Sequence, residues 1–295
     1  VTSSQIQEDA TPDLTFKDSP LDIATLISTA HNYGIYVLME FSGALGSYIN
    51  GTPVYDSFTF YNTAVDASKR SALITSMLNY VEENEFDGIN IYMDKSTSGT
   101  FDDLDGLKAF YEELADAVPE FSSVGKFHLT MSVYGGWTRA SLEGVVNIER
   151  YDWINVLAYC AESLTTGLHS SVWYFGDEAQ QWVTMGVAPE RIVVAAPAFG
   201  LRYFGDISGY TWSNLYSFTE YIGYRQLCAD YPDAPGKNTI DVDNGIYYDG
   251  LADVQAKAEH VIEKGYAGMA LWSIENDSKD ADKSLIKRMN TSLGN

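Results

Sequence analysis

Residues 86–94, Phe-Asp-Gly-Ile-Asn-Ile-Tyr-Met-Asp, form the stretch of sequence that decides the fold. Residues two apart in a strand share one face, so Asn90, Tyr92 and Asp94 lie on one side and the apolar residues between them on the other. A polar face in a buried strand costs free energy unless its groups are hydrogen-bonded or serve chemistry. The stretch therefore predicts a buried strand that carries a candidate site.

Similar apolar strands alternate with amphipathic helices along the rest of the chain. The strands are predicted at residues 34–41, 86–94, 126–134, 153–160, 191–199 and 267–274. The helices are predicted at residues 21–32, 66–84 with Asp66 as its cap, 102–118, 177–185, 217–230, 253–264 and 280–289. Residues 1–20 are polar and turn-like, with no obvious pair of strands.

This alternation predicts an α/β fold with a parallel sheet covered by helices. Two architectures fit, an open doubly wound sheet and a TIM-type barrel. No glycine-rich phosphate loop follows any strand, and polar or aromatic residues end several strands, which favours the barrel. We expect one domain over residues 1–295, with an irregular insertion at residues 200–248 between the last two strands.

The composition narrows the class of partner. The formal net charge of −23 disfavours nucleic acids and anionic membranes, and no apolar run approaches the roughly 18 residues that span a bilayer. The 21 tyrosines and 6 tryptophans suit the apolar faces of sugars, although they also fit a tyrosine-rich surface. A neutral partner is therefore expected, with no nucleic acid and no membrane insertion.

Neither cysteines nor histidines indicate a metal site. Cys160 and Cys228 lack a metal-type spacing and are expected to be free thiols. The four histidines are scattered without a ligand spacing. We expect no metal and no cofactor.

The landmarks together resemble glycoside hydrolase family 18, the chitinases and endo-β-N-acetylglucosaminidases, over residues 21–289. Residues 87–94 hold the frame of the family's fourth-strand motif Asp-Gly-x-Asp-x-Asp-x-Glu. Weaker matches follow the other strands, in the family's order, at residues 34–43, 154–160, 197–200 and 268–272. Each match is weak alone, and five in order make a moderately strong signal.

The resemblance implies a (β/α)8 TIM-type barrel whose first one or two βα units are absent from this numbering. It implies a secreted or extracytoplasmic protein of carbohydrate metabolism that binds a neutral glycan containing N-acetylglucosamine. In the family, the substrate's acetamido oxygen attacks the anomeric carbon, so no protein nucleophile is needed.

The family's roles fall on particular positions here. Asp94 takes the general-acid position, and Tyr92 the position of the aspartate that orients the acetamido group. Tyr159 corresponds to the tyrosine that holds the acetamido oxygen, and Trp272 to the hydrophobic floor under the sugar. Asp87, at the start of the motif, fits an organiser of the backbone better than a ligand contact.

Departures from the motif predict weak hydrolysis or none. Asp94 is one methylene shorter than glutamate, a retraction of roughly 1.5 Å, and a misplacement of about 1 Å can cost about 100-fold in rate. Tyr92 cannot stabilise positive charge as a carboxylate does. Asn90 and Cys160 replace two further aspartates.

Two alternatives remain open. An active retaining chitinase or endo-β-N-acetylglucosaminidase would use Asp94 as its general acid, or a carboxylate from Glu40 on the adjacent strand. In the other reading, these residues merely satisfy one another and the function lies in loops or partner binding.

Several further residues are candidate ligand contacts near the strand ends. Tyr134 ends the strand predicted at residues 126–134, and Trp137 follows two glycines on the next loop. Glu162 has two interpretations: its carboxylate accepts a hydrogen bond from a ligand hydroxyl, or it is exposed and only solvated. Arg202 fits a ligand contact or, as we favour, an ion pair with one of the 41 acidic residues. Glu40 and Cys160 complete the set of substrate-binding candidates.

Overall fold

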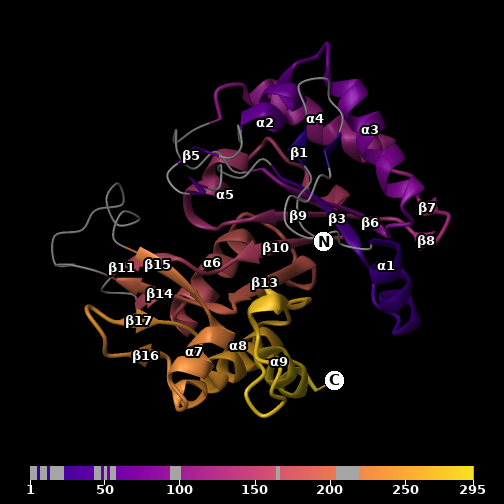
Figure 1. Cartoon of the computed structure of the whole chain (residues 1–295). Helices are drawn as coiled ribbons and strands as arrows, with labels where there is room; N and C mark the ends of the chain where they lie inside the picture. The colour runs from indigo at the N-terminus through magenta and orange to yellow at the C-terminus, as the bar shows by residue number, and fades with distance from the viewer. Residues whose placement is uncertain are drawn as a thin grey trace. The chain divides into compact units, whose positions relative to one another are not determined.

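The computed structural model describes residues 5–6, 12–13, 23–42, 48–49, 52–53, 58–93, 101–163, 167–203 and 219–294. The chain forms two compact units (Figure 1). The first holds residues 1–133 and 137–154, and the second holds residues 134–136 and 155–295. The predicted alternation of strands and helices is present in both units.

Three parallel strands form the centre of the first unit. They are β3 (Leu38–Ser42), β6 (Gly88–Tyr92) and β9 (His128–Val133), and β6 pairs with both of the others. The register places Glu40 beside Asn90 and Asn90 beside Thr130. The middle of these strands is therefore where the polar face of the sequence motif is brought together.

Helices and short antiparallel pairs complete the first unit. The helices are α1 (Ile23–Asn32), α2 (Phe58–Val65), α3 (Arg70–Glu83), α4 (Leu104–Ala117), the 3₁₀ turn η1 (Ile148–Arg150) and α5 (Gly136–Leu142), which begins at the boundary. The pairs are β1 (Gln5–Ile6) with β2 (Pro12–Asp13), β4 (Tyr48–Ile49) with β5 (Thr52–Pro53), and β7 (Phe121–Ser122) with β8 (Gly125–Lys126). Helices α2 and α5 were not predicted.

The prediction that Asp66 caps the helix at residues 66–84 was wrong. Helix α3 begins at Arg70 with Lys69 before it, and the carboxylate of Asp66 instead accepts the Ser68 amide at 2.8 Å in the preceding turn. In α4 a carboxylate does cap the helix, because Asp103 accepts the Gly106 amide at 2.8 Å. An aspartate lies shortly before each of these helices, so its presence in the sequence alone does not identify the cap.

The second unit holds a further parallel pair, β13 (Ile192–Pro197) and β18 (Gly268–Trp272). Strand β10 (Trp153–Leu157) spans the boundary between the units. Helices α6 (Val172–Thr184), α8 (Leu251–Lys264) and α9 (Leu285–Leu293) belong to this unit. Helix α6 begins five residues before its predicted start, because the Ser171 hydroxyl accepts the Tyr174 amide at 3.1 Å.

The region predicted to be irregular contains a four-stranded antiparallel sheet in the order β15-β14-β17-β16. Its strands are β14 (Phe199–Tyr203), β15 (Thr219–Gly223), β16 (Thr239–Ile240) and β17 (Ile246–Tyr247). The helix predicted at residues 217–230 is divided between β15 and helix α7 (Tyr224–Asp230). Gly223, with no side chain to favour either state, marks the change from strand to helix.

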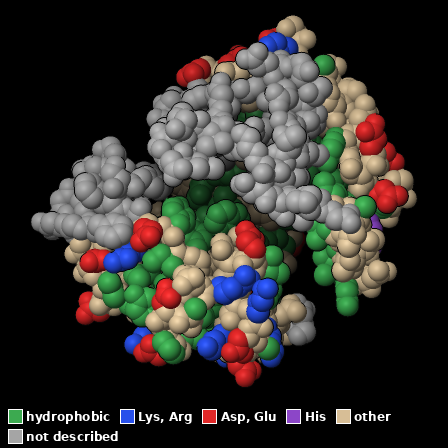
Figure 2. All heavy atoms as spheres, in the orientation of Figure 1, with side chains coloured by type: hydrophobic (Ala, Val, Ile, Leu, Met, Phe, Trp, Pro, Cys, Tyr) green, Lys and Arg blue, Asp and Glu red, His purple; other side chains and the backbone are tan. Residues whose placement is uncertain are grey.

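Charged side chains are mixed on the surface. Figure 2 shows Lys and Arg side chains interspersed with Asp and Glu over the C-terminal unit, without a broad basic area on the face drawn. In the part of the chain that the structure describes, every helix is too short or too polar to cross a bilayer.

Candidate functional site

The structure distributes the predicted site residues over the two units. The first unit contains Glu40, Asp87, Asn90, Tyr92 and Trp137. The second unit contains Tyr134, Tyr159, Cys160, Glu162, Arg202 and Trp272. Asp94, the predicted acid position, lies outside the described residues. We therefore describe a polar network in the first unit and an aromatic cluster in the second.

Asn90 is the centre of the polar network on β3, β6 and β9. Its side-chain amide donates to the Glu40 carboxylate at 2.7 Å and to the Ser132 hydroxyl at 2.9 Å. Its amide oxygen accepts the Thr130 hydroxyl at 2.8 Å. Because donors and the acceptor are all used, the orientation of this buried amide is fixed.

Glu40 is the carboxyl group of this network. Burial raises its pKa, and the hydrogen bond from Asn90 opposes that rise. A carboxyl group with a raised pKa can hold a proton closer to neutral pH than an exposed glutamate does. In chemical terms the group can donate a hydrogen bond or a proton, which a permanently ionised carboxylate cannot.

Tyr92 lies two residues further along β6, level with Ser42 and Ser132 on the adjacent strands. The residue is half-buried, whereas Ile91 before it is fully buried. Strand β6 is buried from Gly88 to Ile91, so Tyr92 is its first partly exposed residue. A neutral phenol with hydroxyl neighbours is suited to hydrogen bonding, since a phenol both donates and accepts.

Asp87 lies at the opposite, amino-terminal end of β6. Its carboxylate accepts the Val37 amide at 2.6 Å and lies 2.9 Å from Nε2 of His31. The side chain is buried and joins the last turn of α1 to the start of β3. These contacts give Asp87 a structural task, as an organiser of the backbone.

Five aromatic residues of the second unit form what we call the aromatic cluster. Its members are Tyr134, Tyr159, Phe199, Tyr221 and Trp272. Trp272 stacks on Tyr159, with ring centroids 6.0 Å apart, and meets Phe199 edge-on at 5.4 Å. Tyr134 meets Tyr159 edge-on at 6.2 Å. Such offset and edge-to-face contacts are the favoured geometries of aromatic pairs.

Exposure divides the aromatic cluster into a base and a surface. Tyr159 and Phe199 are buried, whereas Trp272 and Tyr221 are 49% and 54% exposed. A half-exposed indole held by buried rings offers a rigid apolar face to a ligand. That face can stack on the apolar side of a sugar ring, at a lower entropy cost than a flexible side chain would incur.

Cys160 follows Tyr159 in a left-handed conformation with φ of 63°. Its sulfur lies 3.5 Å from the Tyr221 hydroxyl, and Cys160 is not part of a disulfide. Cys160 thus contacts the aromatic cluster. The backbone of Glu162 lies in β11 (Ala161–Ser163), and that of Trp137 in α5; their side chains lie outside the described atoms.

Arg202 is engaged in ion pairs. Its guanidinium donates to the Asp243 carboxylate, with Nε–Oδ2 at 2.8 Å, and lies 3.5 Å from the Glu220 carboxylate. These contacts join β14 to β15 and to the loop before β17. The ion-pair interpretation of Arg202 matches this arrangement.

Sequence reasoning missed three α6 residues that hold the segment carrying Tyr134. Glu178 accepts the Gly135 amide at 2.6 Å, Gln181 accepts the Gly136 amide at 2.5 Å, and the Trp182 indole donates to the Tyr134 carbonyl at 3.0 Å. Burial raises the pKa of Glu178 to about 7. The available signal was their spacing, which places all three on one face of α6, whereas their partners lie 43 to 48 residues earlier in the chain.

Among the residues that the structure describes, no group of three or more His, Cys, Asp or Glu side chains is arranged to hold a metal ion.

Comparison with known proteins places these features in a family context. The family model described as glycosyl hydrolases family 18 matches residues 4–277. An endochitinase from Brugia malayi is 22% identical over 291 residues, which cover 83% of this chain and 54% of the relative. The chain spans about half the length of the curated relatives it matches.

Solved structures show the fold. A chitinase from Bacteroides thetaiotaomicron matches with a TM-score of 0.75 at 19% identity, covering 99% of this chain and 86% of the other. YKL-39, solved in the presence of chitooligosaccharides (GlcNAc4), matches with a TM-score of 0.74 at 16% identity, covering 100% and 90%. The predicted α/β fold of the TIM-barrel type is confirmed by these likenesses.

Proposed function

Because this chain belongs to glycosyl hydrolase family 18, we propose that it is a chitinase-like protein that binds glycans containing N-acetylglucosamine and hydrolyses them weakly or not at all. The observation that carries the proposal is the half-exposed ring of Trp272 stacked on the buried ring of Tyr159. In this proposal Trp272 is the floor under one sugar ring and Tyr159 fixes its orientation. The YKL-39 structure in the presence of GlcNAc4 supports the same class of ligand.

The polar network supports the weak-hydrolysis part of the proposal. Asn90 and Tyr92 are neutral where the family motif has aspartates, and the Asn90 amide is fully engaged by Glu40, Ser132 and Thr130. A neutral strand cannot stabilise the positive charge that develops as the acetamido group attacks. Asp94 adds a shortened acid at the position where reach matters most.

A second candidate function is slow hydrolysis by a retaining chitinase or endo-β-N-acetylglucosaminidase with Asp94 as the general acid. The observation that favours this candidate is Glu40, which supplies a carboxyl group with a raised pKa on β3, beside β6. Under this alternative, Glu40 supplies the carboxyl group that Asn90 and Tyr92 lack. The family relationship also supports a site of action outside the cytoplasm.

The deciding experiment measures binding and turnover on one preparation. We would titrate the full chain with GlcNAc tetramer and pentamer by calorimetry. The chain would then be incubated for long times with the pentamer and with an N-glycan that carries a chitobiose core, and the products followed by mass spectrometry. Asp94→Ala and Glu40→Gln variants serve as controls for the acid.

Binding without cleavage is the expected result. Cleavage that disappears in Asp94→Ala would replace the binding function with the hydrolytic one, and cleavage that disappears only in Glu40→Gln would move the acid to that residue. An absence of both binding and cleavage would refute the proposal for these glycans.

A further inference from the structure

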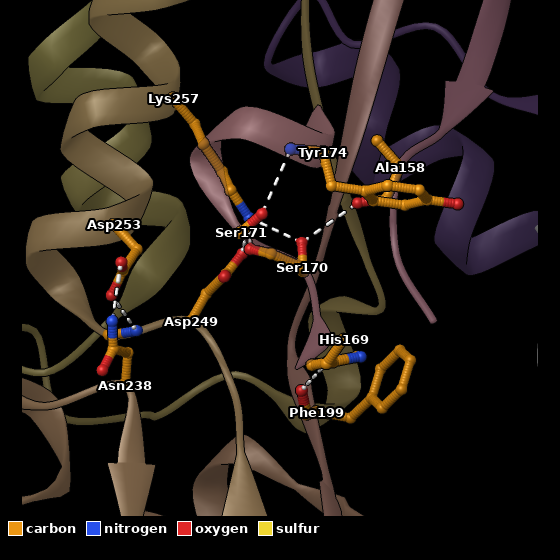
Figure 3. A network of polar contacts seen from close by, with 11 residues as sticks. Ala158, His169, Ser170, Ser171, Tyr174, Phe199, Asn238, Asp249, Asp253 and Lys257 are labelled. Atoms are coloured by element: carbon orange, nitrogen blue, oxygen red, sulfur yellow. Dashed lines mark hydrogen bonds and ion pairs between the residues drawn. The ribbon is translucent and has the colours of Figure 1, made fainter. Parts of the chain in front are cut away.

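A buried polar network in the second unit joins Lys257 of α8 to Ser170 and Ala158, and His169 lies beside Phe199 (Figure 3). Lys257 of α8 is wholly buried, and its ammonium donates to the Asp249 carboxylate, to the Ser170 carbonyl at 2.7 Å and to the Ser170 hydroxyl at 2.6 Å. The three donors of the ammonium are therefore matched by three acceptors. This arrangement fixes Ser170 from one side.

The Ser170 hydroxyl accepts a hydrogen bond on one side and donates one on another. An ammonium group can only donate, so the hydroxyl accepts from Lys257 and must donate elsewhere. It donates to the Ala158 carbonyl at 3.0 Å. The network thus runs from Asp249 through Lys257 and Ser170 to the backbone immediately before Tyr159.

His169 makes the equivalent contact with the other buried ring of the cluster. Its Nε2 lies 2.9 Å from the Phe199 carbonyl, and since a carbonyl only accepts, Nε2 carries the proton. The His169 ring also lies against the Phe199 ring, with centroids 4.8 Å apart. Burial lowers the pKa of His169 to about 3, so the ring is neutral and this hydrogen bond persists near neutral pH.

Two consecutive residues therefore hold the backbone of the two buried rings on which Trp272 rests. We propose that His169 and Ser170, the latter fixed by Lys257 and Asp249, are positioning residues for the aromatic cluster. They set the backbone of Tyr159 and Phe199 so that Trp272 is preorganised for a sugar ring. The consequence of this positioning for glycan binding rests on the proposed function, whereas its effect on Trp272 does not.

A purely stabilising role does not account for this design. Burying an ammonium and a carboxylate costs more desolvation free energy than an apolar pair of similar volume, and replacing such pairs by apolar residues is often neutral or stabilising. Each polar atom here instead serves one end: Asp249 holds Lys257, Lys257 holds Ser170, and Ser170 holds Ala158. Through these contacts, the buried ion pair of Lys257 and Asp249 fixes Ala158, which directly follows β10.

Ser170→Ala is the first test, because it removes the contact with Ala158 and leaves Lys257 with Asp249 and the Ser170 carbonyl. Trp272 fluorescence is isolated by comparing each protein with the same protein carrying Trp272→Phe. We expect acrylamide to quench the Trp272 fluorescence more strongly in Ser170→Ala than in the wild type, without any glycan present. Hydrogen exchange of residues 155–160 should rise with it, since a held backbone exchanges slowly.

The binding arm uses the same variants. Affinity for GlcNAc tetramer should fall about fivefold in Ser170→Ala, the equivalent of one net hydrogen bond. Ser170→Thr keeps the hydroxyl and should restore both the quenching and the affinity. His169→Asn, in which the side chain tolerates the left-handed φ of 67° but falls short of Phe199, is an independent second variant.

Val261→Ala is the matched control, since Val261 is buried one turn after Lys257 on α8 and its apolar side chain can form no hydrogen bond in this network. Urea unfolding measures the stability of each variant. If Ser170→Ala and His169→Asn destabilise the protein as Val261→Ala does, while Trp272 quenching and exchange stay unchanged, the network is only structural and the inference is overturned. A wild-type protein that binds no oligomer refutes the proposed function, and the quenching arm still decides the positioning role.

Discussion

The indole of Trp272 lies over the ring of Tyr159, with centroids 6.0 Å apart and ring planes inclined by 28°. Trp272 ends β18 and is half-exposed, whereas Tyr159 follows β10 and is buried. The two residues are 113 positions apart in the chain, and the β13–β18 pairing carries Trp272 to its position beside Pro197. An exposed indole is thus held by a buried ring, which is the geometry that the binding proposal needs.

Replacing Trp272 tests this geometry. Trp272→Ala should weaken binding of GlcNAc tetramer about tenfold or more, because a large stacking face is lost at a preorganised position. Calorimetry measures the affinity. Trp173→Ala is the matched control, since Trp173 is a similarly exposed tryptophan on α6. Equal losses in the two variants would show that binding is not located at Trp272.

Gly88 is predicted to be irreplaceable for the fold. A Cβ atom at Gly88 would lie 2.0 Å from the His128 carbonyl oxygen, and its φ of 156° is one that side chains rarely adopt. Gly88→Ala should destabilise the protein by about 4 kcal/mol or more, a size reserved for severe backbone conflicts. Gly268→Ala in β18 is the control, because no atom lies within 4 Å of its added Cβ. Urea unfolding of both variants measures the difference, and similar small losses would contradict the close approach.

Helical periodicity predicted most of the helices, because each buries one face, and runs of apolar residues predicted the parallel strands, which are buried on both faces. Helix α3 shows this, with Leu73, Met77 and Val81 four residues apart and all buried. The sheet of β14 to β17 was missed because its strands are short and lie among glycines and tyrosines that carry no clear period. The match to the family motif indicated β6 and its polar face directly.

The contacts that shape the site were harder to predict. Glu178 and Gly135 are 43 residues apart, and nothing local indicates that one accepts from the other. The same holds for Lys257 and Ser170, which are 87 residues apart. Long-range hydrogen bonds depend on the fold rather than on local pattern, so the candidate residues were predictable and their partners were not. The ion pair of Arg202 was the exception, because acidic residues are so abundant.

Glu178 predicts a pH dependence of stability. Its pKa is about 7 in the folded chain against an ordinary value of 4.5, so the folded chain keeps a proton that the unfolded chain has already released. The free energy of unfolding should therefore fall as pH rises from 4.5 to 7 and stay low above that, by about 3 kcal/mol in all. Asp177 on the same helix adds to the effect, because its charge also raises the pKa of Glu178.

Glu178→Gln isolates this contribution. The amide oxygen can still accept the Gly135 amide, and no proton is exchanged at this position. The variant should therefore lose less stability than the wild type when the pH is raised from 5 to 8. Urea unfolding at the two pH values gives the comparison. Asp249, whose pKa burial raises to about 6, contributes equally to both proteins and cancels. Parallel pH profiles for the two proteins would rule out Glu178 as the titrating group.

Glu40 and Asn90 provide the last prediction, because a hydrogen bond of 2.7 Å joins their side chains on β3 and β6. Asn90→Asp restores the carboxylate of the family motif but places it against that of Glu40. Two adjacent carboxylates share a proton, so one pKa rises in the folded chain and stability falls as pH rises. The variant should lose about 1–3 kcal/mol at pH 8 and less at pH 5, since an unpaired buried acceptor is left at high pH.

A compensating change makes the test specific. The Asn90→Asp, Glu40→Gln double variant exchanges the carboxylate and the amide, so the pair again holds one charge and one donor. Its stability at pH 8 should return most of the way to that of the wild type, and unfolding of all four proteins completes a double-mutant cycle. Additive losses with no recovery would show that Glu40 and Asn90 do not act as a pair. Hydrolysis assays on the double variant would then show whether moving the carboxylate onto β6 is enough to raise turnover.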